Sequence, residues 1–286
     1  MRRRHTACRL SPVTLLILNG ALLDESEATL PATDRALTHG LGLYETIKLE
    51  AGAPVFFDEH VARLEQGIAA LGLDKPIDRS ELAAQVLRAA AANGGGDNSC
   101  RLLVTAGPPG GSSNLLVQTD DRDFPDRPLR VVSYRGVRVS AQYKAMTVMQ
   151  SYFAQKAAHD AGVDDALLVD GEGRIFEGAT SNVFVVRAGS LITPPAEGDI
   201  LPGVLRAKVE ELATGAGIPV VEAWARVADL RADDGVLLTS SVRGIVPVES
   251  VDGVRLRIHE HELEQLRSLV GEAEAASTAA FRAAYL

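Results

Sequence analysis

The chain has 286 residues, a net charge of -9 at pH 7, 46% hydrophobic residues and 23% charged residues. This composition is typical of a globular protein with one large or two moderate domains. The acidic balance argues against nucleic acid or an anionic membrane as the partner, although a local basic pocket could still hold a phosphate. No apolar run is long enough to cross a membrane, and two cysteines, Cys8 and Cys100, are too few for a disulfide framework. We therefore expect a cytoplasmic protein.

The first half of the chain predicts a small α/β domain. Its basic start and short apolar run superficially suggest a signal peptide, but Asn19–Gly20 interrupts the run and no convincing cleavage site follows. We expect residues 1–14 to be a disordered extension. Leu15–Leu18 then forms the first strand, and Asn19–Gly20 is a typical hairpin turn. Apolar spacing predicts helices from Glu59 to about Leu71, with Asp58 as N-cap, and over 79–92.

A charged segment with two prolines, residues 119–128, predicts a linker between two domains. It separates a small N-terminal domain, residues 15–118, from a larger C-terminal domain, residues 129–286. The second domain has predicted strands near 129–132, 166–169, 236–238 and 245, and predicted helices over 204–214 and from 260 onward. The expected fold class is therefore mixed α/β, with two domains and a cleft between them.

The stretch from Tyr143 to Phe184 carries the most chemistry. Lys144 precedes apolar residues at helical spacing, so we expect it at a helix start. A Gly162 break, a short apolar strand and a tight turn follow, and Glu177 comes after this predicted hairpin. The lysine and the carboxylate could therefore face one pocket.

Six motifs occur in one order along the chain: an early Asn-Gly, DEHVARL, a lysine before a helix, EGATSNVF, a Thr-Pro followed by ILPGVLR, and TSSVRGIVPV. In combination they resemble the class IV, or fold type IV, pyridoxal-phosphate aminotransferases, from about residue 15 to about residue 254. This family includes D-amino-acid and branched-chain aminotransferases, R-selective amine transaminases and 4-amino-4-deoxychorismate lyase. The resemblance implies a mixed, β-barrel-like core in the larger domain, pyridoxal 5'-phosphate as cofactor, and a homodimer.

The resemblance assigns the catalytic role to Lys144, which matches the family's Schiff-base lysine. The other lysines, Lys48, Lys75, Lys156 and Lys208, stand in contexts typical of solvated charges. A free lysine amine at the reacting carbon can act as general base and then as general acid. Lys144 is therefore expected both to bind the cofactor and to move the proton.

Two further residues match the family's cofactor contacts. Glu177 resembles the carboxylate that keeps the pyridine nitrogen protonated, with a capping or surface glutamate as the alternative. Arg63 in DEHVARL resembles the phosphate-binding arginine. The planar, permanently charged guanidinium group of arginine suits phosphate binding. Its alternative is a surface ion pair with Glu59 one helical turn earlier.

The rest of the expected cofactor site lies in the last third of the chain. The backbone at Val204 and Leu205 opens a predicted helix, whose free N–H groups favour a phosphate. Ser240 and Ser241 would add hydroxyl groups. Leu201 would lie against the cofactor ring, although simple core packing is an equal alternative from sequence.

The motifs do not single out one member of the family. Met149 stands where branched-chain enzymes tend to have a tyrosine, and SSVRG replaces their GTAA-type loop. D-amino-acid aminotransferases carry a carboxylate-binding arginine in a VTRG-like motif, but this chain reads VTAG with Ala106. The candidate substrate-binding residues are Arg35, either in the same chain or from a neighbouring subunit, His39, Arg101 and Arg243. Each arginine alone has a surface role as its alternative.

We predict a transaminase that moves the amino group of a D-amino acid, and also of R-primary amines, to 2-oxoglutarate or pyruvate. The lyase shares every cofactor residue and is the main alternative, and a branched-chain L-amino-acid aminotransferase ranks third. A further alternative is a protein that binds the cofactor or shares only the fold, without turnover. No metal is expected.

Overall fold

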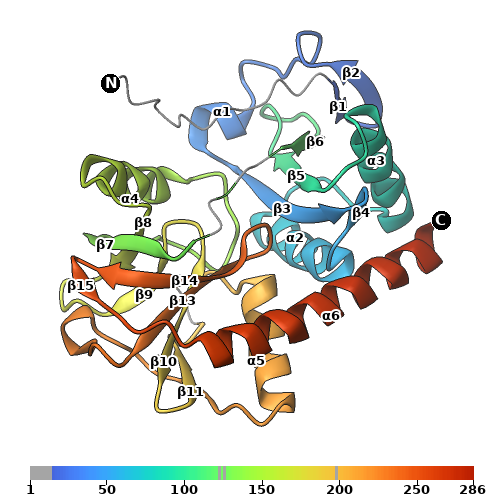
Figure 1. Cartoon of the computed structure of the whole chain (residues 1–286). Helices are drawn as coiled ribbons and strands as arrows, with labels where there is room; N and C mark the ends of the chain where they lie inside the picture. Colours follow the sequence, from blue (N-terminus) through green and yellow to red (C-terminus); the bar gives the residue numbers. More distant parts are fainter. Residues whose placement is uncertain (1–14, 122–123, 125–126, 197–198) are drawn as a thin grey trace, which may run out of the picture. The chain divides into compact units, whose positions relative to one another are not determined.

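The computed structural model describes residues 15–121, 124, 127–196 and 199–286. It divides into two compact units, one of Met1–Phe124 with Ser277–Leu286 and one of Pro125–Ala276 (Figure 1). The expected extension of residues 1–14 and part of the expected linker lie outside the described residues.

The first unit is built on a six-stranded antiparallel sheet in the order β2-β1-β6-β5-β3-β4. Its strands are β1 (Leu15–Leu18), β2 (Ala21–Asp24), β3 (Gly42–Glu50), β4 (Ala53–Pro54), β5 (Asn98–Thr105) and β6 (Asn114–Asp120). Its helices are α1 (Arg35–His39), α2 (Phe57–Leu71) and α3 (Arg79–Ala92). Alternate residues of β3 are buried, as expected for a strand with one face on a core. The Asn19–Gly20 turn and the bounds of α3 agree with the sequence prediction.

The start of α2 differs from the prediction. Asp58 lies inside the helix, and the N-cap is Phe56, which has a φ of 52° and no side-chain capping bond. Tertiary packing sets this helix end instead, because Phe57 is buried edge-on against Phe281, with ring centroids 5.1 Å apart. The Phe56 N–H also donates to Ser277 Oγ at 2.7 Å.

These contacts change the expected domain boundaries. Residues 277–286 group with the first unit, whereas the sequence prediction placed the whole of 129–286 in the second domain. The linker prediction also starts too early, because β6 continues to Asp120 with Thr119 and Asp120 buried. A polar strand end resembles a linker in sequence, and only its pairing with β5 distinguishes the two.

The second unit contains a nine-stranded mixed sheet that curls into a half-barrel, in the order β12-β11-β10-β13-β14-β7-β8-β9 with β15 beside β14. Its strands are β7 (Leu129–Arg135), β8 (Asp165–Val169), β9 (Ile175–Gly178), β10 (Asn182–Arg187), β11 (Ser190–Thr193), β12 (Val220–Glu222), β13 (Gly235–Ser240), β14 (Gly244–Val251) and β15 (Val254–Arg255). Its helices are α4 (Met149–Asp160), α5 (Val204–Gly215), the 3₁₀ helix η1 (Val227–Asp229) and most of α6 (Glu260–Tyr285). Both the expected fold class and the barrel-like core are confirmed.

Strand β8 is buried on both faces. Leu167 and Val169 pack into the main core of the sheet, while Ala166 and Leu168 pack against α4 on the other face. Helix α4 meets the strand through Ala154 and other small residues. Small side chains allow the helix to lie close to the sheet, which leaves no room there for large ones.

Helix α4 therefore differs from the prediction in two ways. It begins only at Met149, so Lys144 lies in the loop before it rather than at its start. The large apolar residues whose spacing predicted the helix, including Met149, Tyr152 and Phe153, are exposed rather than packed against the rest of the chain.

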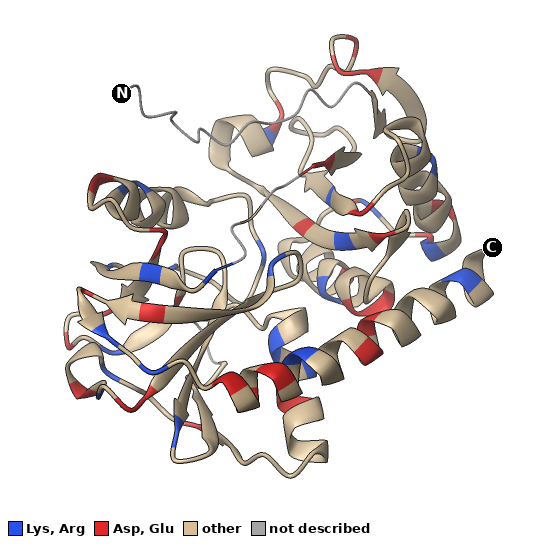
Figure 2. Cartoon of the chain, in the orientation of Figure 1, with Lys and Arg blue, Asp and Glu red and all other residues tan. Residues whose placement is uncertain are grey.

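Helix α6 carries acidic residues in its first turn and Arg282 in its last, an arrangement that complements the helix dipole (Figure 2). It is 26 residues long. Of the helices in the described ranges, none combines the length and the apolar content that a bilayer span requires.

Candidate active site

Glu177 is a fully buried carboxylate on β9, the second strand of the β8–β9 hairpin, rather than after the hairpin as the sequence suggested. Arg138, from the loop after β7, pairs with both of its oxygens: Nε donates to Oε1 at 2.6 Å, and Nη2 lies 2.5 Å from Oε2. The Leu201 N–H donates to Oε2 at 3.4 Å. A buried carboxylate needs such partners to remain charged. Because each oxygen has two lone pairs, the group can still accept a further N–H.

The start of α5 is an uncapped helix end next to Glu177. The N-cap Gly203 supplies no side-chain bond, and Val204 and Leu205 follow in the first turn, both buried. The preceding loop is held to β10, because Asn182 Nδ2 donates to the Leu201 carbonyl at 2.8 Å. A Cβ on Gly203 would lie 1.9 Å from Asn182 Oδ1, so only glycine permits this close approach. Unsatisfied N–H groups at a helix start favour an anion.

The other predicted residues of this unit lie in loops and strand ends. Lys144 is partly buried in the loop between β7 and α4. Ser240 ends β13, its Oγ accepts the Arg243 N–H at 3.4 Å, and Ser241 follows in the turn. Arg243 Nη1 donates to Asp165 Oδ2 at 2.9 Å. Burial raises the pKa of Asp165, and the charge of Arg243 opposes that rise.

In the first unit, Arg63 on α2 is part of a buried charge cluster with Glu45 and His60. Arg63 Nε and Nη2 donate to the two Glu45 oxygens at 2.7 and 2.6 Å, and His60 Nδ1 lies 2.8 Å from Glu45 Oε2. Burial by itself would raise the pKa of Glu45, but the Arg63 charge and the two hydrogen-bonded partners lower it to about 2. Glu45 is therefore an anion that fixes the orientation of Arg63.

Arg35 lies beside the position where the resemblance expects an arginine. Its Nη2 donates to the Ala106 carbonyl at 2.6 Å and its Nε to the Gly107 carbonyl at 3.2 Å. Its position is set by the buried Asp34, which caps α1 and accepts a hydrogen bond from Thr105 Oγ1 at 2.6 Å. Arg35 Nη1 has no protein partner in the part of the chain that the structure describes.

The remaining two substrate candidates are also in the first unit. His39 ends α1, with its Nδ1 2.7 Å from Thr38 Oγ1. Arg101 is on β5, with its guanidinium 5.5 Å from the ring centre of Tyr44.

Sequence reasoning missed Arg138, Glu45 and His60. Arg138 lies in an irregular loop, where no periodicity marks its partner. Glu45 offered a weak signal, since it occupies an inward position on a strand whose alternate residues are apolar. An acidic residue at such a position requires a cationic partner, and in the structure Arg63 is that partner.

The donor set suits pyridoxal phosphate. Glu177 can accept an N–H from the pyridine nitrogen, the N–H groups at the uncapped start of α5 can donate to phosphate oxygens, and Lys144 supplies an amine in the same unit. Across the described ranges, no three His, Cys, Asp or Glu side chains gather as metal ligands.

Comparison with known proteins identifies the family. The model of the family described as amino-transferase class IV matches residues 42–251. A Methanocaldococcus jannaschii protein provisionally named branched-chain-amino-acid aminotransferase is 32% identical over 253 residues, 83% of this chain and 88% of that protein. The D-alanine aminotransferase of Bacillus licheniformis is 28% identical over 251 residues, with the same coverage of each chain. The branched-chain aminotransferase of Thermoproteus uzoniensis has a TM-score of 0.84 at 26% identity and covers 92% of this chain and 95% of its own. The chain therefore belongs to the class IV aminotransferases, which use pyridoxal phosphate.

Proposed function

We propose that this protein is a transaminase that moves the amino group of a D-amino acid to a 2-oxo acid such as pyruvate or 2-oxoglutarate. The observation that carries the proposal is the Arg35 guanidinium at the carbonyls of Ala106 and Gly107. A substrate carboxylate requires a cationic partner, and arginine offers a fork that matches its two oxygens. Arg35 supplies this group beside the position where the chain has Ala106.

The cofactor contacts follow from the donor set. We assign Glu177 to the pyridine nitrogen and the backbone of Val204 and Leu205 to the phosphate, with Arg63 and the Ser240 and Ser241 hydroxyls as further phosphate contacts. Leu201 would pack against the ring. Pyridoxal phosphate supplies an electron sink for the pair left at the substrate carbon when its proton is removed. Arg138 supports this chemistry indirectly, because it compensates the buried charge of Glu177.

Lys144 has two tasks in this proposal. Its Nζ would hold the cofactor covalently. Its amine would also serve as the general base that takes the proton from the substrate α-carbon, and as the general acid that returns it.

The D configuration is supported by the residues that differ from the branched-chain pattern, Met149 and the SSVRG turn, and by the relationship to D-alanine aminotransferase. R-primary amines are a second donor class. A branched-chain L-amino acid is the competing donor, favoured by the 32% identity to the archaeal protein.

The deciding experiment is the amino half-reaction. The yellow, cofactor-loaded protein is mixed in turn with D-alanine, D-glutamate, L-leucine and an R-amine, and absorbance follows conversion to the aminated cofactor. We expect conversion with the D-amino acids. Conversion by L-leucine alone would establish the branched-chain activity. Absence of conversion with every donor would favour the lyase.

The same assay tests Arg35. We expect Arg35→Leu to raise the apparent KM for D-amino acids by about tenfold or more, because the carboxylate loses a charged hydrogen-bond partner. R-amines, which lack the carboxylate, should react unchanged. Arg255→Leu, at an exposed position on β15, is the matched control. An equal loss for acids and amines would show that Arg35 is structural.

A further inference from the structure

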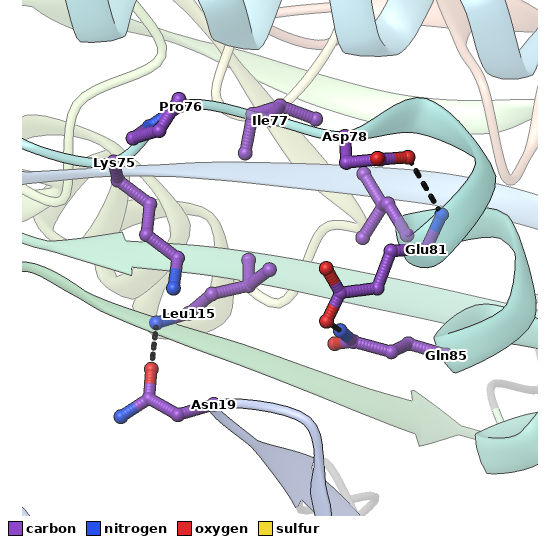
Figure 3. A pocket seen from close by; sticks show the side chains of 9 residues that line it. Asn19, Lys75, Pro76, Ile77, Asp78, Glu81, Gln85 and Leu115 are labelled. Atoms are coloured by element: carbon purple, nitrogen blue, oxygen red, sulfur yellow. Dashed lines mark hydrogen bonds between the residues drawn. The ribbon is translucent and has the colours of Figure 1, made fainter.

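A cavity of about 80 Å³ lies within the first unit, between the loop that joins α2 to α3, the start of α3, and the β1–β2 turn (Figure 3). Its lining includes Asn19, Lys75, Glu81, Leu82, Gln85 and Leu115. None of these residues has a part in the proposed transamination. The volume has room for roughly five groups of the size of a water molecule.

One side of the cavity presents acceptors without enough donors. Gln85 is 5% exposed, and its Nε2 donates to Glu81 Oε1 at 3.0 Å. Its Oε1 accepts no hydrogen bond from any described residue. A buried amide oxygen without a donor is unfavourable. Glu81 stands three residues after the N-cap Asp78, and its side chain bonds Gln85 at the cavity wall.

The other side presents a cation. Figure 3 shows the Lys75 side chain across the cavity from Glu81 and Gln85. Its ammonium forms no ion pair or hydrogen bond within the described ranges, Glu81 included. Opposite charges therefore line one small cavity without neutralising each other. The side chains of Leu82 and Leu115 add apolar surface to its wall.

We infer that this cavity is a binding site for a small zwitterionic amino acid, of the size of glycine or alanine. The ligand's ammonium group would donate to the Glu81 carboxylate and Gln85 Oε1, and its carboxylate would accept from Lys75 Nζ. An ammonium has three donors, which suits two acceptors on one wall, and a carboxylate suits an unpaired lysine. A ligand with a single charge would pair with only one side of the cavity, either Lys75 or Glu81, and would leave the charge on the other side without a partner. The inference is independent of Arg35 and of which amino donor the enzyme uses.

Calorimetric titration of the full-length, cofactor-loaded protein with glycine tests the site. We expect one glycine per chain to bind without a change in the visible cofactor band. Acetate and methylammonium should bind at least about tenfold more weakly, because each satisfies only one wall. Lys75→Met and Glu81→Gln should each weaken glycine binding by about tenfold or more. Lys156→Met and Glu264→Gln, at other sites of the surface, should leave it unchanged.

Several results would overturn the inference. Absence of binding heat, equal affinity for the singly charged analogues, or unchanged affinity in both cavity variants would each do so. Heat that appears only together with a cofactor-band change belongs to the active site and also counts against it. Far-UV circular dichroism of each variant confirms that the fold is retained, so that a loss of binding reports on the cavity.

Discussion

At the scale of one residue, substitution of Lys144 tests the covalent chemistry. We expect Lys144→Ala to lower transamination by at least about 10³-fold, because the variant loses its general base and its covalent hold on the cofactor. Mass spectrometry after borohydride reduction should find the cofactor fixed to the wild-type chain and not to the variant. Lys156→Ala, which removes an exposed lysine paired with Asp160, is the control. Full activity in Lys144→Ala would assign the chemistry to another amine.

Glu45 shows what a single buried charge contributes. It lies between Arg63 and His60, and Glu45→Gln would leave the Arg63 guanidinium without its anion. We expect the variant to lose about 3 kcal/mol of unfolding free energy, as for other broken buried pairs. The control is Glu65→Gln, which breaks the exposed pair with Arg79 and should cost less than about 1 kcal/mol. Urea unfolding measures both, and equal losses would contradict the assignment.

The same residue predicts a pH dependence. The pKa of Glu45 falls from an ordinary value of 4.5 to about 2 in the folded protein. A lowered pKa means that Glu45 contributes its full stabilisation above pH 4.5 and loses it as the pH falls toward 2. The stability difference between wild type and Glu45→Gln should therefore shrink over this interval. A constant difference from pH 5 to pH 2.5 would rule out Glu45 as the titrating group.

At the scale of elements, the close approach of the α5 start to β10 depends on Gly203. Alanine there would push Asn182 away and break its bond to the Leu201 carbonyl. We expect Gly203→Ala to destabilise the protein by about 1–3 kcal/mol and to weaken binding of pyridoxal phosphate to the apo-protein.

Gly215, at the other end of α5, offers the matched control. A Cβ at this position meets no atom within 4 Å, so Gly215→Ala should be neutral or stabilise the helix by up to about 1 kcal/mol. Thermal unfolding and a fluorescence titration with the cofactor compare the two variants. Unchanged cofactor affinity in Gly203→Ala would remove the α5 start from the phosphate site.

At the scale of the whole molecule, the exposed apolar face of α4 fits the expected homodimer. Met149, Tyr152 and Phe153 are 63%, 57% and 44% exposed, and we propose that a second copy covers them. Light scattering should give twice the chain mass of 30.3 kDa. Tyr152→Glu should shift the protein toward monomer, whereas His159→Glu, with the same charge on the same helix, should not. A monomeric wild type would refute the dimer.

The sequence by itself determined the features that depend on local chemistry and on motif order. The Asn19–Gly20 turn, the bounds of α3 and the family followed from turn residues, apolar periodicity and six ordered motifs. These signals are readable because each is contained in a few neighbouring residues. The ambiguity between D- and L-amino acids persisted, since substrate choice depends on a few side chains that no local pattern marks.

Only the tertiary structure decided which distant residues meet. It paired Arg63 with Glu45 and Glu177 with Arg138, set Arg35 at the Ala106 carbonyl, and grouped residues 277–286 with the first unit. It also turned the large side chains of α4 outward, because alanines pack on β8. Periodicity shows that a helix has an apolar face, but not whether its own chain buries that face. Packing and charge compensation are properties of the folded neighbourhood, so they are decided only when the strands and helices come together.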